Sequence, residues 1–271
     1  MSKAFVDTTI LADILLKPGD ERKRGTNALK RFVTSELPVY AIKEFKAGAL
    51  KNYAWFHNNL VLLKSFAKAM AALQRMSLTP RKYTVATALS ALAKATAATA
   101  NTSLEKLAAK YGSKASIDSI LCDRYRLSIK RMIYDAWANR RKVTTNVVLP
   151  LSCYDEIDPI ERNGLLELDP RKCRVTSECC MGPSLKSAPN VLEKLRNAVT
   201  GMPDKPENRR RLKVLKELIR KPKSKMTDED CRNLGDAIFA FFCPPQSVIL
   251  TTNLVDHKPL AEALGKKVES P

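Results

Sequence analysis

Four acidic residues are placed where they could form one site. Three of them follow short apolar segments, and the fourth lies on a helix predicted just before the last of these segments; the four are Asp7, Glu44, Asp256 and Asp236. In an open parallel α/β sheet, ligands gather beyond the carboxyl ends of the strands, where such side chains converge. Clustered carboxylates repel each other without a cation, and oxygen ligands of this type suit Mg²⁺ or Mn²⁺. An ion held there could bind phosphate or activate water.

Strands that alternate with helices are expected at both ends of the chain. Short apolar runs indicate buried strands, and the predicted strands are 4–6, 37–41 and 247–252. Helical spacing follows the first strand from Thr8, and a second helix is predicted over 25–34. This alternation is typical of an α/β fold with a parallel sheet. The helix that carries Asp236 is predicted to run on from Thr227, with Asp236 nearly opposite its apolar stripe.

The middle of the chain has a different composition. Helices are predicted over 60–76, 79–100, 103–111, 116–139 and 190–221, the last broken between Gly201 and Pro206, and 143–190 reads as loop-rich with short strands. Residues 57–225 hold 33 Lys and Arg against 15 Asp and Glu, whereas the two ends are nearly balanced. The predicted organisation is therefore a core made from 1–56 and 226–269, interrupted by a basic, mostly helical insert over 57–225.

The net charge of +19 indicates a polyanionic partner, most often nucleic acid. Two clusters in the insert are candidates for contacts to a phosphate backbone, and their residues are Arg140, Arg141, Lys142, Arg209, Arg210, Arg211 and Lys213. The alternative is a solvated helix surface. Nearby aromatic residues such as Tyr125 and Trp137 could stack on bases, but their helical spacing favours the core.

The ordered segments around the four acids resemble the motifs of PIN-domain nucleases, which include the toxin ribonucleases of toxin–antitoxin pairs. The segments are FVDTTILADIL, VYAIKEFKAGAL, LGDAIFAFF and VILTTNLVDHKPLAEALG. The resemblance implies that Asp7, Glu44, Asp236 and Asp256 bind Mg²⁺ or Mn²⁺ and carry catalysis. It also implies that Thr252 or Asn253 positions a phosphate or a ligand water.

The resemblance covers 1–56 and 226–269, a little over a third of the chain, and leaves the insert unmatched. One departure is His257, which stands where the family commonly has Phe and is expected to be exposed. It leaves open whether Asn253 or Asp256 faces the metal.

The predicted function is a metal-dependent endoribonuclease that hydrolyses RNA phosphodiester bonds, with the substrate held by the basic insert. RNA is implied by the family, since the residues do not decide between RNA and DNA. An inhibitor or antitoxin protein and a homodimer are further partners that the resemblance implies. The alternatives are a catalytically silent PIN-like module that binds RNA, and a structural component of a larger complex.

Each acid also has a plainer interpretation. Asp7 could be only the N-cap of the helix that begins at Thr8, Glu44 a solvated residue favoured by the helix dipole, and Asp236 an exposed residue. Four cysteines cluster without a CxxC spacing, and structural zinc stays open for them: Cys153, Cys173, Cys179 and Cys180. Apolar runs are too short for a membrane span, the start of the chain does not read as a signal peptide, and the odd cysteine count favours the cytoplasm.

Overall fold

The structure is a computed structural model, and it describes residues 2–17, 19–77, 86–87, 89–93, 109, 112, 116–151, 154, 156–168, 181–223 and 225–271. Most of the helices predicted over 79–100 and 103–111 falls outside these residues. All four clustered cysteines do so too, so the zinc alternative stays a prediction.

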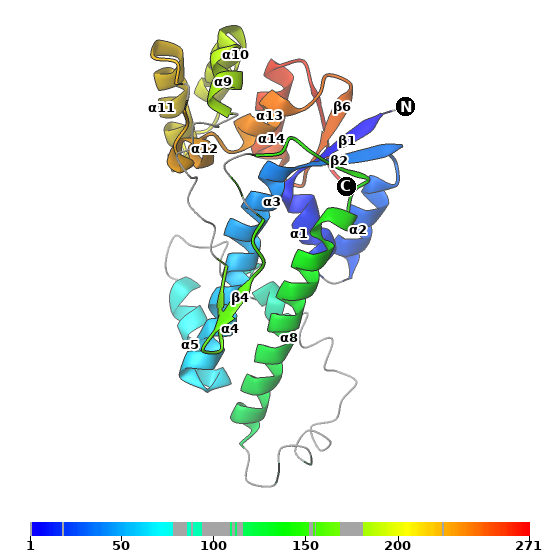
Figure 1. Ribbon diagram of the computed structural model, residues 1–271, viewed down its shortest axis with the longest axis vertical. Helices are drawn as coiled ribbons and strands as arrows, with labels where there is room; N and C mark the ends of the chain where they lie inside the picture. Colours follow the sequence, from blue (N-terminus) through cyan, green and yellow to red (C-terminus); the bar gives the residue numbers. More distant parts are fainter. Residues whose placement is uncertain are drawn as a thin grey trace.

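The centre of the fold is a five-stranded, all-parallel sheet (Figure 1), which confirms the α/β prediction. Its strands are β1 (Lys3–Val6), β2 (Thr34–Pro38), β3 (Asn146–Val148), β6 (Ser247–Leu250) and β7 (Lys267–Glu269). The order is β3-β2-β1-β6-β7, with Val6 of β1 paired with Leu250 of β6. The chain builds outward in both directions from β1 and β6. The gap between their carboxyl ends is thus the switch point at which such sheets bind ligands.

Helices cover the sheet and extend well beyond it (Figure 1). Those next to the sheet or leading away from it are α1 (Thr8–Leu16), α2 (Asp20–Leu29), α3 (Val39–Phe45), the π-helix η1 (Lys46–Leu50), α4 (Lys51–Leu63), α5 (Phe66–Ser77), α8 (Ile117–Asn139) and the 3₁₀ turn η2 (Arg140–Lys142). The later ones are α9 (Met181–Lys186), α10 (Pro189–Thr200), α11 (Pro206–Arg220), α12 (Asp228–Leu234), α13 (Asp236–Phe242) and α14 (Leu254–Ala263). Within the described residues, no helix is long and apolar enough to cross a membrane.

The second strand begins and ends earlier than predicted. It covers Thr34–Pro38, and the apolar residues that follow open α3 at Val39. Val39, Tyr40 and Ala41 are all buried, because this helix is covered on most sides. The prediction over 37–41 was wrong in its bounds since a short apolar run has no period that separates a strand from a buried helix.

Residues 57–225 contribute to three parts of the molecule (Figure 1). α5, α8 and the hairpin of β4 (Ile160–Arg162) and β5 (Leu165–Glu167) form a long extension with α4. β3 joins the main sheet beside β2. α10 packs on α11 and on α14, so this helix pair lies against the carboxyl-terminal part of the chain. The predicted break between Gly201 and Pro206 is confirmed and separates α10 from α11.

Candidate functional site

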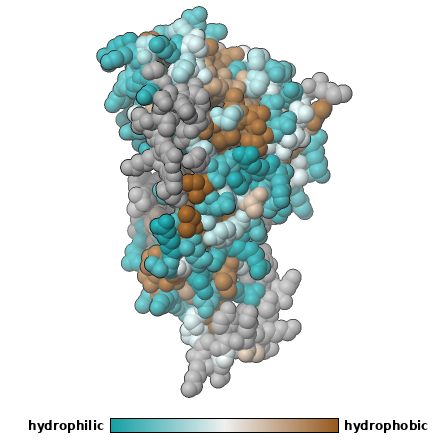
Figure 2. Space-filling model, viewed as in Figure 1, coloured by the Kyte–Doolittle hydropathy of each residue, from teal (hydrophilic) through white to brown (hydrophobic). Residues whose placement is uncertain are grey.

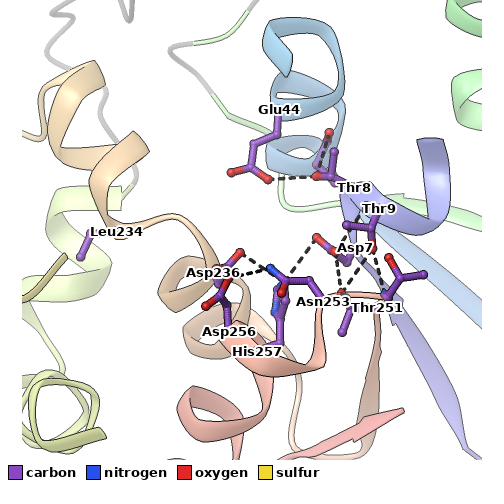
Figure 3. A network of polar contacts seen from close by, with 12 residues as sticks. Asp7, Thr8, Thr9, Glu44, Leu234, Asp236, Thr251, Asn253, Asp256 and His257 are labelled. Carbon is purple, nitrogen blue, oxygen red and sulfur yellow. Dashed lines mark hydrogen bonds and ion pairs between the residues drawn. The ribbon is translucent and has the colours of Figure 1, made fainter. Parts of the chain in front are cut away.

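The carboxyl ends of β1 and β6 bring distant polar residues together (Figure 3). Asp7 follows β1 directly, and its backbone N–H donates to the carbonyl of Leu250, the last residue of β6, at 3.0 Å. Thr251 comes next after β6 and donates through Oγ1 to Asp7 Oδ2 at 2.8 Å. Hydrogen bonding between the neighbouring parallel strands β1 and β6 therefore brings the side chains of Asp7 and Thr251 together.

Asp7 is both a helix cap and a buried anion. Its side chain is 2 % exposed and accepts hydrogen bonds from the Thr9 backbone N–H and from Thr9 Oγ1, at 3.3 and 2.7 Å. It is thus the N-cap of α1, as the plainer interpretation held. Burial acts to raise the pKa of this carboxyl, but the nearby His257 charge and the hydroxyl donors lower the pKa to about 2. Asp7 is therefore an anion at neutral pH.

His257 occupies the space between two carboxylates. Its Nε2 atom lies 3.6 Å from Asp7 Oδ1 and 3.2 Å from Asp236 Oδ1, and its ring packs edge-on against Phe239. The side chain is 1 % exposed, so the expectation of an exposed His257 was wrong. Burial lowers the pKa of the imidazole, but the charges of Asp7 and Asp236 dominate and raise the pKa to about 10. His257 thus acts as an internal cation. Its Nδ1 atom finds no hydrogen-bond partner among the described residues.

Glu44 reaches the same space from the far end of α3 (Figure 3), where the chain passes into the π-helix η1. Thr8 Oγ1 donates to Glu44 Oε2 at 2.9 Å. Burial of the carboxyl, together with the charges of Asp236 and Asp7, raises the pKa of Glu44 to about 8. Glu44 is half-buried and hydrogen-bonded to Thr8, so it is not a fully solvated residue. An unneutralised carboxylate at this position is costly beside the other two.

Asp236 is positioned by a break in its helix. The continuous helix predicted from Thr227 is wrong, because Gly235 adopts φ +46° and ψ −118° and divides α12 from α13. That conformation is accessible essentially only to glycine. Asp236 then opens α13, where its side chain remains 20 % exposed. Arg211 Nη2 donates to its Oδ2 at 2.8 Å, and His257 lies on the Oδ1 side.

The segment after β6 is organised around hydroxyl and amide groups. Asn253 Nδ2 donates to Asp256 Oδ2 at 3.0 Å, so the two residues that the sequence left as alternatives are partners. Thr252 is exposed, and its backbone N–H donates to Thr9 Oγ1 at 3.0 Å. The buried Thr251, rather than Thr252, contacts Asp7.

Four residues of the network were missed by the sequence reasoning as site residues. They are Thr8, Thr9, Thr251 and His257, and each contacts one of the predicted acids. Hydroxyl residues directly after an acid at a strand end could have indicated such a network, since their hydroxyl groups can donate hydrogen bonds to nearby carboxylates. Nothing local marks His257, because its partners are 21 and 250 positions away in the sequence.

The two predicted basic clusters differ in their surroundings. Arg140 and Arg141 both pair with Glu156, and the Arg140 guanidinium stacks 3.7 Å from the centre of the buried Trp137 ring. Trp137 and Tyr125 are core residues, as favoured. Lys142 is exposed in the 3₁₀ turn that follows α8. This cluster is therefore engaged largely with the protein itself.

The second cluster lies on α11. Arg209 and Arg210 are exposed and pair with Asp204 and Glu207, whereas Arg211 is buried and lies inside the protein. A surface groove of about 470 Å³ runs along the outer face of α11, and its lining residues are Arg209, Leu212, Lys213, Lys216, Glu217 and Arg220. The surface over α11 is hydrophilic in Figure 2, in contrast to the hydrophobic area over α13. This outer face carries exposed positive charge.

The resemblance implies a divalent cation, so the side chains at this edge have to suit Mg²⁺ or Mn²⁺ as ligands. Among the described residues, no group of three or more His, Cys, Asp and Glu side chains stands ready-made at ligand distances. The chemistry of the donors nevertheless fits Mg²⁺ or Mn²⁺, because the converging groups are carboxylate oxygens. Burial, and after it the charges of Asp236 and Asp7, raise the pKa of Glu44. His257 Nε2 lies between two of these carboxylates, those of Asp7 and Asp236.

Comparison with known proteins adds no relative. No family model, no curated protein and no solved structure matches the chain.

Proposed function

We propose that the protein is a Mg²⁺- or Mn²⁺-dependent endoribonuclease that hydrolyses phosphodiester bonds at the edge between β1 and β6. The observation that carries the proposal is the gathering of Asp7, Glu44 and Asp236 at the switch point of a parallel sheet, with the pKa of Glu44 raised to about 8 by its surroundings. Strongly perturbed carboxyl groups in such a place are characteristic of catalytic sites.

Asp7, Glu44 and Asp236 would hold the ion, and Asp256 would join them if its carboxylate left Asn253. When bound there, Mg²⁺ or Mn²⁺ would lower the pKa of a ligand water and stabilise the charge that develops on the phosphate. The chain's own hydroxyl groups fix the carboxylates: Thr9 and Thr251 hold Asp7, and Thr8 holds Glu44. Thr252 and Asn253, which follow β6, would contact a phosphate group.

The outer face of α11 would bind the RNA backbone. An acidic edge repels a polyanion, so affinity has to come from cations elsewhere on the surface. Exposed Lys and Arg side chains neutralise phosphates and release counterions without reading sequence. Arg209, Lys213, Lys216 and Arg220 share one face of α11 and line its groove. RNA is therefore the proposed partner. The cytoplasm is the proposed location. An inhibitor protein and a homodimer are proposed from the resemblance alone.

The test is cleavage of a mixed RNA pool by the full chain with Mn²⁺, with Mg²⁺ and with a chelator. The wild type should cut only with a divalent ion. Asp7→Asn keeps the capping geometry but removes the charge, and it should bind RNA as well as the wild type without cutting it. A wild type that binds RNA but does not cut it with either ion would contradict the nuclease.

One observation favours a second candidate, a module that binds RNA without cutting it. The His257 imidazole already contacts Asp7 and Asp236, and Arg211 contacts Asp236, so internal cations partly neutralise the edge without a metal. In that case Asp7→Asn and the wild type would bind RNA equally and neither would respond to Mn²⁺. The same cleavage assay separates the two functions.

A further inference from the structure

Arg211 is the one member of the basic α11 cluster that points into the protein. Its side chain is 5 % exposed, whereas Arg209 and Arg210 on the same helix are exposed. Its guanidinium donates to Leu234 O through Nε at 3.0 Å, to Asn208 Oδ1 through Nη1 at 3.0 Å and to Asp236 Oδ2 through Nη2 at 2.8 Å. Each of its three nitrogens therefore has an acceptor, which fits the planar fork of arginine and not the single ammonium of lysine.

The contacts of Arg211 join two helices at their break. Leu234 is the last residue of α12, and Asp236 is the first residue of α13. A cation at the last carbonyl of a helix is stabilised by the helix dipole. An added Cβ at Gly235, between these residues, would lie 3.5 Å from Arg211 Nη2, which is an ordinary contact distance, so glycine is needed there for its backbone conformation and not for space. Asn208 Nδ2 donates to the Pro203 carbonyl at 2.9 Å, so the side chain that accepts from Arg211 Nη1 is itself held in place.

A buried cation needs a counter-charge, since an unpaired charge in the interior is strongly unfavourable. Asp236 supplies this charge with Oδ2, which leaves Oδ1 on the side of His257 and Asp7. The inner face of α11 therefore determines how the Asp236 carboxylate is turned. Lys213 and Lys216, on the outer face of the same helix, line the groove.

We propose that Arg211 is a positioning residue of the acidic edge: it holds one oxygen of Asp236, leaves the other facing His257, and so makes the α10–α11 pair part of the site. This inference rests on the proposed function, because it assigns Arg211 a role in forming the cation site. Hydrogen-bonding partners of a metal ligand typically change metal affinity or activity by about 10- to 100-fold when they are removed.

The experiment measures Mn²⁺ affinity by calorimetry, without RNA, for the wild type, Arg211→Met, Asp236→Asn and the double variant. Arg211→Met should weaken Mn²⁺ binding by about 10-fold, with RNA affinity in the presence of chelator unchanged. Arg211→Met should add little in the Asp236→Asn background, because it acts through that carboxylate. Arg196→Met is the matched control, since Arg196 lies on α10 and pairs with Glu193 away from the site.

Arg211→Lys keeps the charge but cannot reach all three acceptors, and its Mn²⁺ affinity should fall between those of the wild type and Arg211→Met. If Arg211→Met fails to fold, the Mn²⁺ affinity of Arg211→Lys tests the proposal instead. Unchanged or tighter Mn²⁺ binding in Arg211→Met, full affinity in Arg211→Lys, or full additivity in the double variant would each overturn the positioning role. A wild type that binds no Mn²⁺ would overturn the cation site as well, so the two failures are distinguishable.

Discussion

The acidic edge and the outer face of α11 carry charge in opposite ways. At the edge, Asp7 and His257 are buried and held by several partners each. On α11, Arg209 and Lys213 are exposed, and the Arg209 pair with Asp204 is open to solvent. The pKa values of two acids at the edge shift in opposite directions: the pKa of Asp7 falls to about 2 and that of Glu44 rises to about 8. The neighbours, not the residue type, set the charge there.

This difference determines what a substitution does in each region. Exposed ion pairs contribute little to stability, because water and salt screen them. Removing one member of a buried pair leaves the other charge without compensation, which is strongly destabilising. Changes at the edge should therefore alter the fold and the chemistry together, whereas changes on the outer face of α11 should alter only affinity for a polyanion.

The largest effect is expected from Asp7→Ala. It removes the cap of α1 and leaves the buried His257 facing fewer anions, so the free energy of unfolding should fall by roughly 3–5 kcal/mol. Urea unfolding followed by circular dichroism measures this. Asp204→Ala, which breaks an exposed pair, is the control and should leave the unfolding midpoint unchanged. Equal effects of the two substitutions would remove the distinction between the regions.

A smaller loss is expected from Gly235→Ala. The backbone at φ +46° and ψ −118° is strained for any residue with a Cβ, and the cost should be about 1–3 kcal/mol. Thermal and urea unfolding give the value. Gly48→Ala is the matched control, because a Cβ there meets nothing within 4 Å. If Gly235→Ala is as stable as Gly48→Ala, the break between α12 and α13 does not need glycine.

The pH dependence of stability should report Glu44. Its pKa in the folded protein, about 8, lies above the ordinary value of 4.5, so the unfolded state releases its proton first as pH rises. The stability that Glu44 contributes is complete below pH 4.5 and is lost as pH rises through 8. The free energy of unfolding of the wild type should thus fall relative to that of Glu44→Gln across this window. Parallel pH profiles for the two proteins would contradict the raised pKa.

The smallest effects belong to the outer face of α11. Lys213→Met and Lys216→Met should each weaken RNA binding a few-fold and lower the slope of log affinity against log salt by about 1. Fluorescence anisotropy at several salt concentrations measures this, and Mn²⁺ affinity should not change. Lys267→Met, exposed on β7, is the matched control. A Lys267→Met effect equal to that of Lys213→Met would show that only net charge matters.

Secondary structure could be predicted from the sequence where a local pattern is compatible with one structure only. The acid directly after β1 and the alternation of helices with β1, β2 and β6 are of this kind. The apolar residues at 39–41 were misassigned because a buried helix and a buried strand look alike over so short a run. The break at Gly235 was not predicted, because the helix was expected to continue from Thr227 through Asp236.

His257 and Arg211 show the limit for the candidate site. Each is basic, and composition alone suggests an exposed side chain. Both are buried because a carboxylate far away in the sequence compensates their charge, and that pairing exists only after β1, β6, α11 and α13 have packed. The prediction of the four acids rested on a local pattern, since three of them lie at or soon after strand ends.

The central claim is that Asp7, Glu44 and Asp236 form one cation site. The most direct measurement is the anomalous difference density of a crystal soaked in Mn²⁺, recorded near the manganese absorption edge. We expect a peak bounded by these three carboxylates, with the His257 side chain moved away from Asp7 and Asp236. No peak there, with His257 still in contact with both carboxylates, would contradict it.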